Sequence, residues 1–209
     1  MILSKKSAVK GKIKKEIKKA GSKCEQLGYL INKYSHEDGY RKAIVEEIIE
    51  FKEIMDITEA ITNAATTTVG GKRHPHHYRK SKKTLEEAKI ILIKEAYKIS
   101  RINSFDKLHE SIIDLLKDIP NIGPLYYYDT ALLIGAHLGK LPEKIYLHAG
   151  TKKGAKNMGI NIRNKKYIEM GYIPCLEIFE NYYLKPYEIE DFLCIYKEEL
   201  SSVFKKYKP

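Results

Sequence analysis

Apolar side chains recur at helical spacing along most of this chain. Between residues 37 and 64 they fall every three or four positions, and glutamates crowd the other side. This pattern predicts helical structure over 37–64. The buried stripe is expected to contain Ile44, Ile48, Phe51, Met55 and Ile61.

The same spacing predicts further helices. Thr84 followed by Glu87 is a capping-box pattern, which starts a helix that runs to about Ile99. Residues 105–117 form a shorter amphipathic helix, and Pro186 suits the first turn of a last helix. The last helix is expected to bury Ile189, Phe192, Leu193, Tyr196, Leu200, Val203 and Phe204.

Strand signals are weak. Only Lys144–Leu147 and Ile160–Arg163 hint at short extended pieces, and neither supports a sheet. The chain is therefore predicted to be all-α, with a single helical domain over 24–209 that contains the helical hairpin described below. A basic N-terminal segment, 1–23, precedes this domain.

The net charge of the chain indicates the kind of partner that it binds. Lys and Arg number 38 against 27 Asp and Glu, which gives +11 at pH 7 and a pI near 9.3. Such an excess favours polyanions, and nucleic acid above all. No stretch approaches the roughly 20 apolar residues of a membrane span. We therefore expect no membrane partner and a cytoplasmic location.

The cysteines suggest no special chemistry. Cys24, Cys175 and Cys194 are far apart and form no C-x-x-C pair, so neither a zinc site nor a redox pair is predicted. We interpret them as small buried hydrophobic residues. The 43% hydrophobic content is sufficient for a core without disulfides or metal, and no cofactor is predicted.

The positive charge gathers in three zones that are poor in acids: Lys5–Lys23, Lys72–Lys83 and the stretch between Glu143 and Glu169. Cations and imidazoles contact phosphates, and tyrosine stacks on bases, so these zones favour one polyanion surface. The histidine spacing in the second zone matches no standard zinc pattern, so no metal is predicted. The candidate nucleic-acid contacts are Lys72, Arg73, His74, His76, His77, Tyr78, Arg79, Lys152, Lys153 and Lys156.

A turn rich in Pro and Gly separates two predicted helices, the second being Leu125–Leu138. Its sequence at 120–123, Pro-Asn-Ile-Gly, resembles the Pro-Gly-Ile-Gly hairpin of helix-hairpin-helix DNA-binding elements. Asn121 stands in place of the first glycine, and Asn tolerates a left-handed backbone. The resemblance implies that Asn121 and Gly123 bring backbone N–H groups to a DNA phosphate without reading sequence.

The order of hairpin, helix, Gly-Lys-Leu-Pro-Glu turn and extended piece is similar to that of the helix-hairpin-helix superfamily of DNA glycosylases. This resemblance implies an all-α enzyme that removes damaged or modified bases flipped out of kinked DNA. The family's nucleophilic lysine would fall at Leu125, and no acid lies at 144–148, where its aspartate is expected. The iron–sulfur cysteines are also missing. The chain would therefore be a divergent base-excision enzyme.

Asp129 is the best alternative carboxylate, because it lies just after the hairpin and base removal needs a carboxylate to stabilise a cationic sugar or activate water. His148 is its expected partner. The structural alternatives are a helix-start charge for Asp129 and a hydrogen-bonded histidine for His148. Tyr126 and Tyr127 are candidates for stacking on bases, although at least one residue of the run 126–128 must face the core.

Two other functions stay open. One is a non-catalytic nucleic-acid-binding protein, with DNA favoured over RNA. The other is a metal-independent, toxin-like RNA-cleaving nuclease that uses His76 or His77 with Arg79. The three hypotheses differ in their products, which are abasic sites, an unchanged substrate and cleaved RNA.

Overall fold

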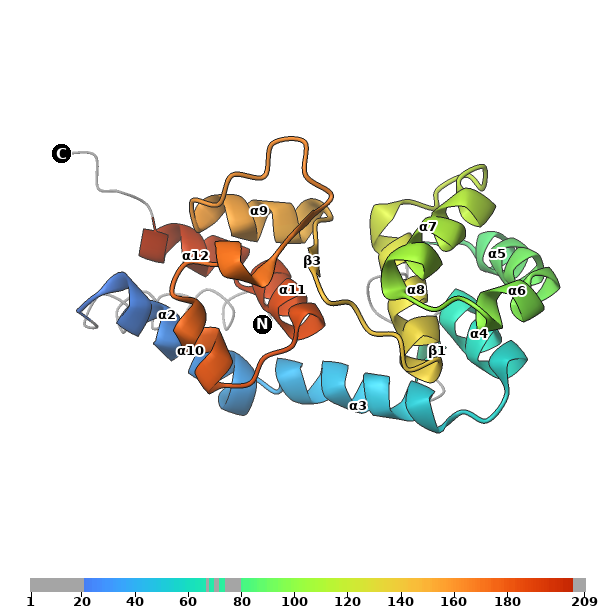
Figure 1. Cartoon of the computed structure of the whole chain (residues 1–209), viewed down its shortest axis with the longest axis horizontal. Helices are drawn as coiled ribbons and strands as arrows, with labels where there is room; N and C mark the ends of the chain where they lie inside the picture. The colour runs from blue at the N-terminus through green and yellow to red at the C-terminus, as the bar shows by residue number, and fades with distance from the viewer. Residues whose placement is uncertain (1–20, 67, 70–71, 74–79, 205–209) are drawn as a thin grey trace, which may run out of the picture. The chain divides into compact units, whose positions relative to one another are not determined.

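Figure 1 shows a computed structural model of the chain, in which nearly all regular structure is helical. The structure describes residues 21–66, 68–69, 72–73 and 80–204. The predicted all-α class is confirmed. Contacts between Cα atoms divide the chain into two compact units, unit 1 (Met1–Lys42 and Lys144–Pro209) and unit 2 (Ala43–Glu143). The proposed boundary after residue 23 stays a prediction, and residues 1–20 lie outside the described part.

Unit 2 is built around α8, which is flanked by α4 and α7 (Figure 1). Ten of the 14 residues of α8 are buried, as expected for a helix that is apolar on most sides. The elements are α3 (Tyr40–Glu53, which begins in unit 1), α4 (Ile57–Thr66), β1 (Thr68–Val69), β2 (Lys72–Arg73), α5 (Lys82–Lys94), α6 (Ala96–Ser100), α7 (Phe105–Leu116) and α8 (Pro124–His137).

The helical pattern over 37–64 forms two helices because the chain breaks before Asp56. The Asp56 side chain accepts a hydrogen bond from the Glu59 backbone N–H at 2.9 Å, which starts α4 afresh. Met55 falls in the break and is 95% exposed, so its predicted place in the core is wrong. Ile48 and Ile61 are buried as predicted.

The start of α5 lies earlier than predicted. Ser81, not Thr84, is the N-cap, and its hydroxyl accepts a hydrogen bond from the Thr84 backbone N–H at 3.0 Å. The helix also breaks at Glu95, which divides the predicted element into α5 and α6. By contrast, the helix predicted at 105–117 is confirmed almost to the residue.

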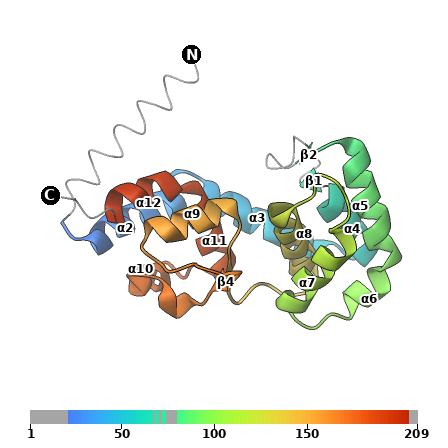
Figure 2. The same cartoon turned by 90° about the horizontal axis from the view of Figure 1, so that it is seen from above.

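Unit 1 combines the two ends of the described chain (Figure 2). The last helix begins at Pro186, as predicted, but divides in two at Tyr196. The elements are α2 (Lys23–Asn32), η1 (Lys33–Glu37, a turn of π-helix), β3 (Ile145–Tyr146), α9 (Ala149–Asn157), β4 (Tyr167–Ile168), η3 (Met170–Tyr172, a 3₁₀-turn), α10 (Leu176–Asn181), α11 (Pro186–Ile195) and α12 (Lys197–Phe204).

The only strand pairing in unit 1 among the described residues joins β3 to β4 in antiparallel register, with Ile145 opposite Ile168. The extended piece predicted at 144–147 is therefore confirmed. The piece predicted at Ile160–Arg163 is not a strand, and the partner of β3 lies farther along the chain. Ile145 and Ile168 are both buried, so burial on the core face selects this register.

A disulfide joins Cys24 at the start of α2 to Cys175 before α10. The two cysteines are 151 positions apart in the sequence, and their Cα atoms are 5.7 Å apart. The interpretation of these cysteines as simple buried hydrophobic residues is wrong. Their wide separation gave no local signal of a pair, because only the folding of unit 1 brings the two segments together.

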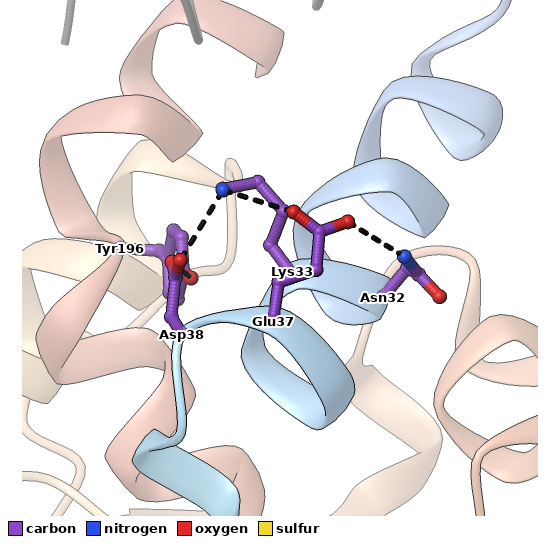
Figure 3. A network of polar contacts seen from close by, with 5 residues as sticks. All are labelled: Asn32, Lys33, Glu37, Asp38 and Tyr196. Carbon is purple, nitrogen blue, oxygen red and sulfur yellow. Dashed lines mark hydrogen bonds and ion pairs between the residues drawn. The ribbon is translucent and has the colours of Figure 1, made fainter. Parts of the chain in front are cut away.

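A polar network holds the π-helical turn η1 (Figure 3). The Lys33 ammonium lies 3.2 Å from a carboxylate oxygen of Glu37 and 3.2 Å from one of Asp38. The Tyr196 hydroxyl from the end of α11 donates to Asp38, and the Asn32 amide donates to Glu37 at 3.1 Å. Burial lowers the pKa of Lys33, but the hydrogen bonds to Asp38 and Glu37 outweigh it and leave that pKa raised.

Two glycines let α9 lie directly on α11. A Cβ atom on Gly150 would collide with the Cys194 sulfur, and one on Gly154 would collide with the Leu193 carbonyl oxygen. The sequence Gly-Thr-Lys-Lys-Gly-Ala-Lys at 150–156 therefore forms a closely packed helix in place of a phosphate-binding loop.

We expect Gly154→Ala to destabilise the protein by about 1–3 kcal/mol, because overpacking outweighs the usual helical gain from alanine. Urea unfolding followed by circular dichroism measures the change. The matched control is Gly171→Ala, where nothing lies within 4 Å of the new Cβ atom. Equal stability of the two variants would contradict the close contact between α9 and α11.

Buried tyrosines predict a loss of stability at alkaline pH. Burial, reinforced by Asp191, raises the pKa of Tyr34, and burial with Asp38 raises that of Tyr196. In the unfolded chain these phenols ionise near pH 10. Their contribution is therefore fully present below about pH 10 and is lost as the pH rises towards the folded values.

We expect the free energy of unfolding to fall above about pH 10, with each buried phenol contributing a slope of about 1.4 kcal/mol per pH unit. Tyr34→Phe should reduce the slope by that amount in urea titrations at stepped pH. Tyr183→Phe, at a ring that is 80% exposed, is the control and should leave it unchanged. An identical slope in both variants would refute the assignment to Tyr34.

Candidate nucleic-acid interface

The connection between α7 and α8 is a tight turn between two helices that pack against each other. Helix α7 ends at Leu116, with Lys117 as its C-cap, and Ile119 in the turn is buried. Asn121 has a φ of 66°, which lies in the left-handed region. Asn is one of the few residues that adopt this backbone at low cost.

No side chain caps the N-terminus of α8, so its first backbone N–H groups carry the positive end of the helix dipole. Gly123 is the N-cap and has no side chain with which to cap the helix, and Pro124 occupies the first position. None of the residues in the first turn is acidic. The N–H groups of this turn and the helix dipole therefore favour an anion, and Asn121 and Pro124 are exposed beside them.

Lys80 places a cation at this turn. Its ammonium donates a hydrogen bond of 2.5 Å to the Asn121 carbonyl oxygen and lies 5.7 Å from the centre of the Tyr126 ring. Burial lowers the pKa of Lys80, and the nearby Asp129 carboxylate partly opposes that shift. The turn thus carries a lysine from a distant part of the sequence.

All three tyrosines after the turn are buried. The Tyr126 hydroxyl donates to the Ala65 carbonyl oxygen at 2.5 Å, and burial raises its pKa. The Tyr127 hydroxyl donates to the Ile122 carbonyl oxygen, a contact that joins α8 to the turn. Rings in these positions cannot stack on a base without leaving the core. The structure thus removes Tyr126 and Tyr127 from the surface on which stacking was predicted.

Asp129 lies in α8 of unit 2 and is half-buried. The Asp129 carboxylate opposes the lowering of the Lys80 pKa by burial. A carboxylate can stabilise a cationic sugar, which is the role predicted for Asp129.

His148 belongs to unit 1, whereas Asp129 belongs to unit 2. The His148 side chain is buried at the start of α9. Its Nε2 contacts a carboxylate oxygen of Glu190 and lies 3.0 Å from the Thr151 hydroxyl, which also donates to Glu190. In a hydroxyl–histidine–carboxylate triad the two partners bind opposite ring nitrogens. Here both meet Nε2 in the interior, so the geometry favours a structural role in joining α9 to α11.

Three lysines of the third basic zone face solvent along α9. Lys152, Lys153 and Lys156 are exposed, and Lys153 forms an ion pair with Glu198 at 2.5 Å. Lys72 and Arg73 form β2, which pairs antiparallel with β1. The other predicted contacts of the second zone lie outside the described residues, namely His74, His76, His77, Tyr78 and Arg79.

Two residues of these sites were missed by sequence reasoning. Lys80 lies at the end of a basic run, but its partner Asn121 is 41 positions away. Glu190 reads as an ordinary acid of α11, and only the packing of α9 brings it to His148. Neither contact has a local signature, because both depend on tertiary packing.

Comparisons with known proteins give no relative from which a function could be carried over. The chain matches no protein-family model, and the curated proteins and the solved structures give no significant match. Within the described residues, no group of three His, Cys, Asp or Glu side chains is arranged to hold a metal ion. The described helices are all too short or too polar to cross a bilayer.

Proposed function

We propose that this protein binds DNA through the turn between α7 and α8. The observation that carries the proposal is the left-handed Asn121 next to an uncapped, positive helix N-terminus, with Lys80 held at the same turn. A turn with small exposed side chains lets backbone N–H groups approach a phosphate oxygen. Phosphates are present at every step of DNA, so such a grip is independent of sequence.

The charge distribution supports the same partner. The net charge of +11 favours a polyanion, and the exposed lysines of α9 offer further phosphate contacts in unit 1. Contacts of this type strengthen as salt is lowered, because binding releases counterions from the DNA. The resemblance of the turn to helix-hairpin-helix elements selects DNA over RNA within this proposal.

Gly123→Asp separates binding from stability. Asp is a favoured N-cap, and a Cβ atom added at this position meets nothing within 4 Å, so the fold should hold. The new carboxylate would occupy the first-turn N–H groups and repel phosphate. We expect affinity for duplex DNA to fall about tenfold and the slope of log K against log salt to decrease by about one.

The control for this variant is Thr58→Asp, which adds the same charge in the exposed first turn of α4. Fluorescence anisotropy with a labelled duplex measures both variants across a salt series. If Gly123→Asp binds as tightly as Thr58→Asp and the unaltered chain, the turn is not the DNA-binding site.

We further propose base excision as the chemistry of this site, on the observation that Asp129 is half-buried in α8, the helix that begins at the turn. Incubation with duplexes that carry modified bases should give abasic sites, which are detected by alkaline strand cleavage. Asp129→Asn should slow product formation by about 100-fold or more and retain binding.

Asp114→Asn is the control for that variant, since Asp114 is an exposed carboxylate paired with Lys117 on α7. It should react like the unaltered chain. Absence of product across a broad panel of modified bases would refute the enzymatic part of the proposal and leave DNA binding intact.

A further inference from the structure

Unit 1 contains a pocket of about 420 Å³ that the proposed function does not use. Its lining comes from the segment that follows α9, from β4 and from η3. The lining residues are Asn164, Lys165, Lys166, Tyr167, Ile168, Glu169 and Tyr172. A volume of this size falls within the roughly 300–1,000 Å³ typical of small-ligand sites.

The wall of this pocket is held by the pairing of β3 and β4. The Leu147 backbone N–H donates to the Lys166 carbonyl oxygen at 2.9 Å, and Ile168 is buried. Asn164 takes a left-handed φ of 58°, which turns the chain before the strand. Because the strand fixes Ile168 in the core, its neighbour Tyr167 points to the opposite face, where it is exposed.

Each of the two pocket tyrosines has a lysine over its ring. The Lys144 ammonium lies 4.3 Å from the centre of the Tyr167 ring, and the Lys165 ammonium lies 4.4 Å from that of Tyr172. Tyr172 is 62% exposed despite its size. The pocket therefore presents aromatic surface and positive charge at the same place.

This combination selects the chemistry of a ligand. Lys165 and Lys166 line the pocket against one acid, Glu169, so it is cationic. An acidic peptide would pair with the lysine ammonium groups of the pocket and leave the tyrosine rings without a partner. A nucleotide would contact both the ammonium groups and the rings. Its base stacks on an aromatic face and its phosphate pairs with the lysines.

We infer that this pocket binds one nucleotide of a single-stranded nucleic acid, with the base against Tyr172 and the phosphate at Lys165 and Lys166. The inference rests on the proposed function for the class of partner. It concerns unit 1, whereas the duplex-binding turn belongs to unit 2, so the two sites are tested by different variants and different ligands.

The test is binding of the full chain to fluorescent oligothymidylate and to an oligomer of equal length that lacks bases. We expect the base-bearing strand to bind about tenfold more tightly, as one stacked base provides. Tyr172→Leu should abolish this preference, and Tyr172→Phe should retain it. Lys165→Gln should weaken both strands alike and reduce the salt dependence.

Tyr97→Leu is the matched control. Tyr97 is a 72% exposed tyrosine in unit 2 with the Arg101 guanidinium 5.5 Å from its ring centre, and it does not line the pocket. It should bind both strands like the unaltered chain. A parallel titration with oligouridylate shows whether the natural strand is DNA or RNA.

The inference is overturned if the unaltered chain binds strands with and without bases equally. It is also overturned if Tyr172→Leu keeps the preference. The effect of Gly123→Asp on duplex binding is read separately. If the chain binds oligothymidylate through Tyr172 but does not bind a duplex, the inference about this pocket holds and the proposed function of the turn is refuted.

Discussion

Unit 1 depends on contacts between two segments that are more than 100 residues apart in the sequence. Tyr34 from the first segment is fully buried, donates a hydrogen bond of 3.0 Å to Asp191, and meets the Phe192 ring edge-on at 5.6 Å between centres. Arg41 pairs with the buried Glu188 at 2.7 Å. A carboxylate buried in this way is tolerated because its partner arrives from the other segment. Neither segment can therefore form this core alone.

The packing of α9 on this core decides which of its side chains reach solvent. Gly150 and Gly154 face α11, and Thr151 is buried between them with its hydroxyl on Glu190. Helical periodicity then turns Lys152, Lys153 and Lys156 outwards. The exposure of these three lysines is thus a consequence of a glycine-mediated helix contact. They are the proposed phosphate contacts of unit 1.

The two proposed binding sites share one arrangement, a lysine beside a tyrosine ring. At the turn, Lys80 lies over Tyr126, whose ring is buried and serves as a support. In the pocket, Lys165 lies over Tyr172, whose ring is exposed. Because the Tyr126 ring is buried and the Tyr172 ring is exposed, the two lysine–tyrosine pairs suit different ligands. The turn is suited to phosphate alone, and the pocket to a base with its phosphate.

The sequence by itself determined the features that depend on neighbours within a turn or two of helix. Apolar spacing located α7, the turn rich in Pro and Gly located the start of α8, and Pro186 located the start of α11. The tolerance of Asn121 for a left-handed backbone was evident from its residue type. The tertiary structure decided the rest. It paired Cys24 with Cys175, joined His148 to Glu190, brought Lys80 to the turn, and buried the tyrosines that seemed available for stacking. The physical reason is that capping and periodicity are local, whereas these contacts join residues about 40 to 150 positions apart and exist only once the helices have packed.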